Sequence, residues 1–127
     1  MSAIYTNEWV RIEIEPAEIP WLKIFAQAPC KEMTDCDTPT RQYIWQLLDI
    51  VEREMRDYFK PDKINIASFA NYLPQVHWHI MARYKNDSFF PEPMWGKKQR
   101  ESTAVFPPLP PFVEQLKTRI AASNRTI

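Results

Sequence analysis

The segment Gln75–Tyr84 constrains the fold of this chain most strongly, because its side chains alternate in character. One alternate set is wholly apolar and consists of Val76, Trp78, Ile80 and Ala82. Alternation of this kind predicts a half-buried β-strand whose apolar face packs on a core. Gln75, His77 and His79 would then project from the opposite face, about 6.6–6.8 Å apart. The chain has only these two histidines, so this face is the first candidate for chemistry.

Two imidazoles on one strand face allow three interpretations. Imidazole titrates near neutral pH, so the pair can supply a nucleophile or base together with a proton donor. Neutral imidazole is also the commonest protein ligand for metals, so the pair can instead bind a metal ion. The third interpretation is a pair of partly exposed strand histidines without chemistry. The placement of both histidines of the chain on one face favours the two chemical interpretations.

The segment Gln75–Met81, Gln-Val-His-Trp-His-Ile-Met, resembles the histidine triad (HIT) motif, in which three histidines alternate with apolar residues. It matches six of the seven motif positions and departs at the first, where Gln75 replaces a histidine. The flanking segments 63–69, 71–74 and 82–96 are similar to a bacterial branch of that family. The resemblance covers most of residues 10–96, and the histidine segment is its specific part.

The resemblance implies a nucleotide hydrolase that cleaves at the α-phosphate of dinucleoside polyphosphates or nucleoside phosphoramidates. Substrates of this kind would contain adenosine. The middle histidine of the family motif attacks phosphorus, and water then hydrolyses the nucleotidyl-histidine intermediate. Carried over by position, His77 is the nucleophile, His79 contacts the phosphate or the leaving group, and Gln75 is the third catalytic position. The resemblance also implies a homodimer and no cofactor or metal.

Two alternatives to the hydrolase stay open, and Gln75 favours the first of them. Glutamine can orient a neighbour by hydrogen bonding, but it carries no titratable proton. The first alternative is therefore a catalytically weakened HIT-fold module that binds nucleotides or regulates a partner. The second is a metal enzyme that uses His77 and His79 as ligands, although a stable site needs a third protein ligand and glutamine is a poor one.

Four further residues are nucleotide-binding candidates by resemblance. Asn71 lies where relatives place a polar side chain that contacts phosphate. Glu15 lies near a ribose-contacting position of the family, and a carboxylate can accept hydrogen bonds from ribose hydroxyls. Arg83 shares the face of His79, and Trp95 lies in a tail that reaches the substrate pocket in some relatives. A structural salt bridge for Arg83 and an aromatic plug for Trp95 are the alternatives.

Patterns along the rest of the chain predict an α+β fold. Besides the histidine segment, alternation predicts strands at residues 9–15, 21–27 and 63–69. Thr38 as a cap and Pro39 as the first helical residue predict a helix that runs to about Phe59. Residues 112–122 predict a C-terminal helix. The order ββαββα with short connections indicates an antiparallel sheet, and the HIT resemblance implies about five strands around one long central helix.

Length and charge bound the possible functions. The 127 residues suit one HIT-like domain, with a core over about residues 9–96 and a basic loop, Pro-rich connector and helix over 97–127. The chain has 16 Lys and Arg residues together and 16 Asp and Glu residues together. This balance argues against a protein that binds nucleic acids or membranes through a general excess of positive charge. A single glycine excludes a P-loop. No signal peptide or long apolar run is present, so a cytoplasmic location is expected.

Cys30 and Cys36 are the only cysteines of the chain. Their spacing does not fit the usual C-x₂₋₄-C metal site, and cytosolic proteins seldom keep a disulfide. Both residues are therefore expected to be free structural thiols.

Two segments after residue 96 have a simple structural interpretation. The basic cluster Lys97–Arg100 is expected to be a solvated loop, with contact to a phosphate as its alternative. Residues 106–112 contain a PxxP pattern of the kind that SH3 domains bind. A stiff connector that leads into the last helix is the preferred interpretation.

Overall fold

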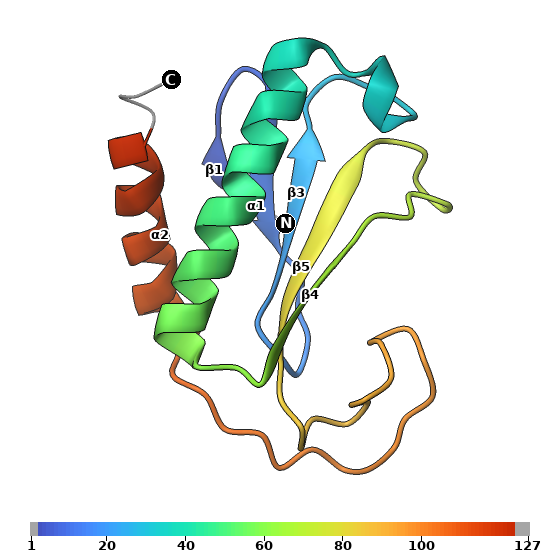
Figure 1. Ribbon diagram of the computed structural model, residues 1–127, viewed down its shortest axis with the longest axis vertical. Helices are drawn as coiled ribbons and strands as arrows, with labels where there is room; N and C mark the ends of the chain where they lie inside the picture. Colours follow the sequence, from blue (N-terminus) through green and yellow to red (C-terminus); the bar gives the residue numbers. More distant parts are fainter. Residues whose placement is uncertain (1–2, 124–127) are drawn as a thin grey trace.

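The computed structural model describes residues 3–123, which form one five-stranded antiparallel sheet with helices on one face (Figure 1). The strands lie in the order β1-β2-β3-β5-β4. This arrangement confirms the predicted α+β class. In chain order the elements are β1 (Ala3–Thr6), β2 (Val10–Ile14), β3 (Trp21–Ala26), the short 3₁₀ helix η1 (Met33–Asp35), α1 (Thr38–Phe59), β4 (Lys63–Ala67), β5 (His77–Arg83) and α2 (Leu109–Ser123).

The helix α1 lies across the sheet with α2 beside it (Figure 1). Its predicted range, 38–59, is confirmed, but the N-cap is Asp37 rather than Thr38, because the Asp37 carboxylate accepts a hydrogen bond from the Thr40 amide at 3.0 Å. Lys60 ends the helix in the left-handed region. The predicted apolar stripe is buried against the sheet and includes Ile44, Leu47, Leu48, Val51, Met55 and Phe59.

Strand register separates a helical face from an open face. Ile24 pairs with Trp78 and Leu22 with Ile80 on the side that α1 covers. Side chains alternate along a strand, so the intervening pairs Lys23–His79 and Phe25–His77 lie on the opposite face. Both histidines therefore point away from α1, as the alternation predicted.

Two element boundaries differ from the expectation. The strand β5 begins at His77 rather than Gln75, because the Val76 amide donates to the carbonyl of Cys30 and turns the chain before the strand. The helix α2 begins at Leu109, three residues earlier than predicted. Pro110 and Pro111 are accommodated there because the first turn of a helix leaves its amides without intrahelical partners.

The fifth strand is β1, which the sequence did not locate. It is four residues long, half exposed, and pairs with β2 through an irregular register between Ala3 and Tyr5. A segment so short shows too few alternations to be recognised by pattern. Within residues 3–123, neither helix is both long enough and apolar enough to cross a membrane.

Cys30 and Cys36 form a disulfide, so the prediction of free thiols is wrong. The turn between β3 and α1 folds back on itself and brings the two Cα atoms to 5.7 Å, within the usual range for a disulfide. Both residues are buried against the core cluster. The disulfide therefore closes the loop that leads from the histidine end of the sheet into α1.

Candidate active site

A cavity of about 440 Å³ lies on the open face of the sheet and contains both histidines. Its floor is formed by Lys23 and Phe25 of β3 and by His77 and His79 of β5. Residues 69–73 and Trp95 line the rest of it. The volume lies within the usual range for sites that bind small molecules. The predicted histidine face is therefore also the face that holds a ligand-sized space.

His77 is held as one defined tautomer by the backbone. Its Nδ1 lies 2.8 Å from the carbonyl oxygen of Gln75. A carbonyl oxygen can only accept, so Nδ1 carries a proton, and in the neutral ring Nε2 keeps its lone pair. The ring stacks on Phe25 with the two centroids 4.9 Å apart. In its neutral form the ring therefore has its unprotonated nitrogen at Nε2, and an imidazole lone pair of this kind is a competent nucleophile.

His79 lies next to His77, with ring centroids 5.1 Å apart, and is only 8% exposed. Burial lowers its pKa to about 4, and the neighbouring His77 and Lys23 act in the same direction while Glu15 opposes them. His79 is therefore neutral at physiological pH. It can donate a hydrogen bond from one ring nitrogen, but it does not carry a positive charge there.

The side chain of Gln75 does not reach the cavity, although its place in the motif predicts a catalytic role. Its Nε2 donates to the backbone carbonyl of Ala26 at 2.7 Å, and Gln75 does not line the cavity. Only its own carbonyl reaches the histidines, through His77 Nδ1. Gln75 thus ties the start of β5 to the end of β3 through its side chain and orients the His77 ring through its main-chain carbonyl.

Lys23 is a cavity residue that the sequence interpretation missed. It pairs directly with His79 across the two strands, and its Nζ lies 2.7 Å from Glu15 Oε1. Glu15 itself does not line the cavity, but it pairs with the cavity residue Lys23. The shared alternation of Trp21, Lys23 and Phe25 in the predicted hairpin strand was the available signal.

The model of the HIT domain matches residues 3–86. This chain belongs to the HIT-domain family. No curated protein sequence matches it.

Solved HIT structures share the fold over most of their length. A histidine triad protein from Bradyrhizobium japonicum is 27% identical, with a TM-score of 0.76 over 94% of this chain and 90% of its own. A histidine triad protein from Marinobacter aquaeolei VT8 is 23% identical, with a TM-score of 0.72 over 91% and 90%. A histidine triad (HIT) protein from Sinorhizobium meliloti 1021 is 25% identical, with a TM-score of 0.68 over 94% and 84%. The chain therefore has the HIT fold and belongs to a family of nucleotide-binding and nucleotide-hydrolysing proteins.

Two of the four predicted nucleotide-binding residues lie in the cavity that contains His77 and His79. Asn71 and Trp95 both line it. Trp95 places the edge of its ring against His79, with centroids 4.8 Å apart, and contacts Phe69 in the same manner at 5.0 Å. An amide from Asn71 and an aromatic wall from Trp95 and Phe69 therefore surround the histidines.

Arg83 lies outside the cavity and is 1% exposed. Its Nε and Nη2 donate to both carboxylate oxygens of Asp87, its Nη1 to Asn65 and its Nη2 also to the carbonyl of Glu92. Every guanidinium nitrogen has a protein partner, so Arg83 is the structural salt bridge that was the alternative for this residue. The contact with Glu92 holds the loop that carries Trp95. Arg83 therefore has no donor directed at a ligand in the cavity.

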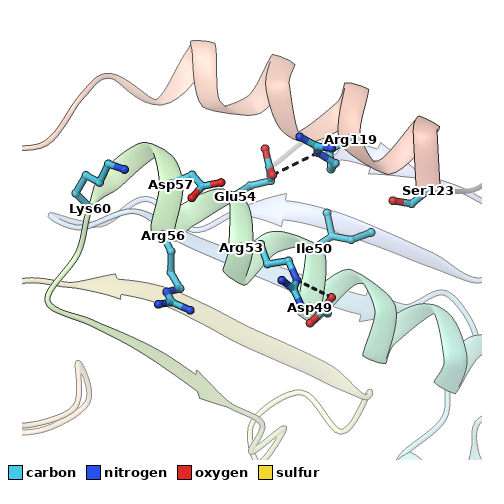
Figure 2. A pocket seen from close by; sticks show the side chains of 9 residues that line it. All are labelled: Asp49, Ile50, Arg53, Glu54, Arg56, Asp57, Lys60, Arg119 and Ser123. Carbon is cyan, nitrogen blue, oxygen red and sulfur yellow. Dashed lines mark hydrogen bonds and ion pairs between the residues drawn. The ribbon is translucent and has the colours of Figure 1, made fainter.

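A larger cavity of about 690 Å³ lies on the helical side of the sheet, between α1 and α2 (Figure 2). Most of the residues that line it are charged and exposed. Four of them form ion pairs, Arg53 with Asp49 and Arg119 with Glu54. Neither histidine lines it.

The basic cluster 97–100 is exposed and does not line the histidine cavity. Within residues 3–123, no group of three or more His, Cys, Asp or Glu residues is placed to hold a metal ion.

Proposed function

We propose that this protein is a HIT-type nucleotide hydrolase that cleaves at the α-phosphate of adenosine-containing dinucleoside polyphosphates or phosphoramidates. The observation that carries the proposal is the hydrogen bond from His77 Nδ1 to the Gln75 carbonyl, which in the neutral ring puts the lone pair on Nε2 of a cavity-lining residue. A nucleophile that is already deprotonated needs no separate base. The missing first histidine of the motif is therefore compatible with turnover.

The reaction proceeds in two steps. The lone pair of His77 Nε2 forms a bond to the α-phosphorus, and the bond from phosphorus to the leaving group breaks with its electron pair. Water then attacks the nucleotidyl-histidine, the P–N bond breaks, and the pair returns to Nε2. Charge on the phosphoryl oxygens is stabilised by hydrogen bonds from His79 and Asn71 and by the Lys23 ammonium, which all line the same cavity.

The nucleoside is bound by the apolar part of the cavity. Phe25, Phe69, Leu73 and Trp95 supply apolar surface beside the histidines, and Phe69, Leu73 and Trp95 are each about half exposed. A flat base covers such side chains and removes their surface from water. Glu15 acts by holding Lys23 through their 2.7 Å ion pair.

Intact-mass spectrometry tests the covalent step. The protein is mixed with diadenosine tetraphosphate and quenched at short times, with His77→Ala and Trp9→Phe as parallel variants. Wild type and Trp9→Phe gain one adenylyl group and His77→Ala gains none, because Trp9 stacks on Tyr43 away from the histidines. An adduct that persists in His77→Ala would contradict the assignment of the nucleophile.

A catalytically weakened nucleotide-binding module is the second candidate. It is favoured by one observation: the Gln75 side chain is committed to Ala26, so the first motif position contributes no side chain to the cavity. Nucleotide binding by calorimetry with neither adduct nor product supports this candidate over the hydrolase. Gln75→His, run beside it, restores the family motif and measures what the substitution costs in rate.

We further propose a homodimer formed along the outer edge of β4. Among residues 3–123 no strand pairs with that edge, and Ile66 on it is 41% exposed. On the same helical face Trp45 is 50% exposed, and Trp78 Nε1 is buried without a partner in the described part of the chain. Light scattering should give a dimer for wild type and a monomer for Ile66→Glu. A wild-type monomer would contradict the assembly.

A cytoplasmic location belongs to the same proposal, because nucleotide substrates of this class are intracellular. The disulfide between Cys30 and Cys36 is unusual for a reducing compartment. Cell fractionation tests the location directly, and recovery of the protein outside the cytoplasm would contradict it.

A further inference from the structure

Trp21 contacts the second histidine through a hydrogen bond. The indole Nε1 lies 3.1 Å from Nδ1 of His79. An indole N–H can only donate, so Nδ1 of His79 is the acceptor and the ring proton of the neutral imidazole is on Nε2. His77 is held in the opposite way, with its proton on Nδ1. The two neighbouring imidazoles therefore have opposite tautomers, one with a free lone pair and one with a free N–H.

We infer that Trp21 is a positioning residue that holds His79 as a neutral Nε2–H donor, and that the protein therefore prefers leaving groups that depart as stable anions. Phosphates, nucleotides and carboxylates are such groups, whereas amines are not. This inference rests on the proposed hydrolase function and narrows its substrate class.

Protonation of His79 is opposed by the way the ring is held. A second proton would have to go onto Nδ1, where it would face the Trp21 N–H at 3.1 Å and replace a hydrogen bond with two opposed donors. The surroundings add to this. Lys23 on β3 and His77 on the same strand disfavour a positive ring, and only Glu15, already paired with Lys23, favours it. The ring is also buried between Trp21 and Trp95.

The neutral state decides which bond the site can break. When His77 Nε2 forms its bond to phosphorus, the electron pair of the broken bond departs on the leaving atom. A phosphate or carboxylate oxygen carries that pair as an anion, stabilised by a hydrogen bond from His79 and by the Lys23 charge. An amine nitrogen must accept a proton as it leaves, and a neutral imidazole N–H is a poor acid compared with an imidazolium. In the second step the proton lost by water goes to solvent.

The tautomer can be measured without any substrate. Two-bond ¹⁵N–¹H spectra of the uniformly labelled full chain report both histidines, and His77→Ala assigns the remaining one. We expect His79 to show a protonated Nε2 and a bare Nδ1, unchanged down to about pH 5. Trp21→Phe keeps an aromatic ring but lacks the donor, so its His79 should mix tautomers and titrate about one pH unit higher.

Trp95→Phe is the matched control for this measurement. The indole of Trp95 also presents its edge to His79, but it makes no hydrogen bond with that ring in the described structure. Its spectrum should keep the wild-type tautomer. The role of Trp21 is overturned if wild-type His79 carries its proton on Nδ1, or if Trp21→Phe leaves the tautomer unchanged.

The substrate preference is tested by comparing leaving groups. Wild type should turn over diadenosine tetraphosphate with a higher kcat than adenosine phosphoramidate. In Trp21→Phe at about pH 5.5, a larger fraction of imidazolium should raise the ratio of phosphoramidate to tetraphosphate kcat roughly five- to tenfold. Equal kcat values in wild type, or an unchanged ratio in the variant, overturn the preference and leave the hydrolase proposal intact. Absence of any turnover overturns the hydrolase proposal, whereas the nitrogen spectra still decide the role of Trp21.

Discussion

The two ends of β5 use the same face of the sheet in opposite ways. At its start His77 and His79 each have one hydrogen-bonded ring nitrogen, and both line a cavity. At its end Arg83 is fully charged and closed off, with its partner Asp87 also buried. The start of β5 leaves ring nitrogens available to a ligand, whereas at its end every guanidinium nitrogen is hydrogen-bonded to the protein.

Along this single strand, the start is arranged to bind a ligand and the end is arranged to stabilise the fold. A neutral imidazole can stay half buried and unpaired on one nitrogen at modest cost, because it carries no charge to desolvate. A buried guanidinium must be paired on every side. The closed end also serves the open one, because Arg83 and Asp87 hold the loop on which Trp95 reaches the cavity.

The largest expected effect is the removal of the Asp87 carboxylate. Asp87→Ala leaves Arg83 buried without its partner and frees the backbone amides of Tyr84, Phe89 and Phe90. We expect a loss of about 3–5 kcal/mol in the free energy of unfolding, measured in urea. The exposed pair of Arg53 and Asp49 is the control, and Asp49→Ala should cost less than about 0.5 kcal/mol. Similar costs for both variants would remove the contrast between the closed end and a surface pair.

Reduction of the disulfide should have the next effect. The bond between Cys30 and Cys36 restrains a short loop in the unfolded chain, so reductant should lower the free energy of unfolding by about 2 kcal/mol. The double variant Cys30→Ser with Cys36→Ser should not respond to reductant. If reductant leaves the wild-type urea midpoint unchanged, the loop is held by packing rather than by the bond.

Acid should weaken the closed end selectively. Burial by itself raises the pKa of Asp87, but hydrogen bonds from Arg83 and three backbone amides outweigh it and hold the pKa at about 2. A folded-state pKa below the unfolded value stabilises the protein above about pH 4 and loses that contribution as the pH falls toward 2. The stability gap between wild type and Asp87→Asn should therefore narrow by about 2 kcal/mol over that range. A gap that stays constant in urea titrations from pH 5 to 2 would contradict this account.

The smallest effect is expected at the rim of the open end. Phe69 is 57% exposed and supplies part of the apolar wall of the cavity. Phe69→Ala should raise KM about fivefold, equivalent to about 1 kcal/mol of substrate binding, with little change in stability. Val105, 88% exposed and outside the cavity lining, is the control. A KM that rises equally in Val105→Ala would show that the wall does not bind substrate.

Much of the architecture could be predicted from local pattern. Helix α1 was placed at its observed residues, because a long apolar stripe and a proline at the first turn leave little choice. Each end of the four longer strands was predicted to within two residues. The strand β1 escaped because four half-exposed residues carry too little pattern, and its partner β2 decides its conformation.

The candidate site was predicted less completely. Asn71, His77, His79 and Trp95 line the cavity, whereas Gln75, Glu15 and Arg83 do not. Gln75 was predicted as a catalytic position from the motif, but the motif does not reveal that its side-chain amide is hydrogen-bonded to the Ala26 carbonyl. Lys23 and Trp21 were absent from the expectation, since their importance depends on which strand lies beside β5.

The sequence by itself determined that two histidines share one face of a strand in a HIT-like α+β fold, because side-chain alternation is a local property of the chain. Only the tertiary structure decided how each histidine is held. Strand register places the Trp21 indole against His79 Nδ1, and the bend of the chain before β5 places the Gln75 carbonyl against His77 Nδ1. The paths of two loops bring Cys30 to Cys36 and Asp87 to Arg83. These features depend on distances between residues far apart in the chain or on how a loop folds back, and a local pattern of polarity carries no information about either.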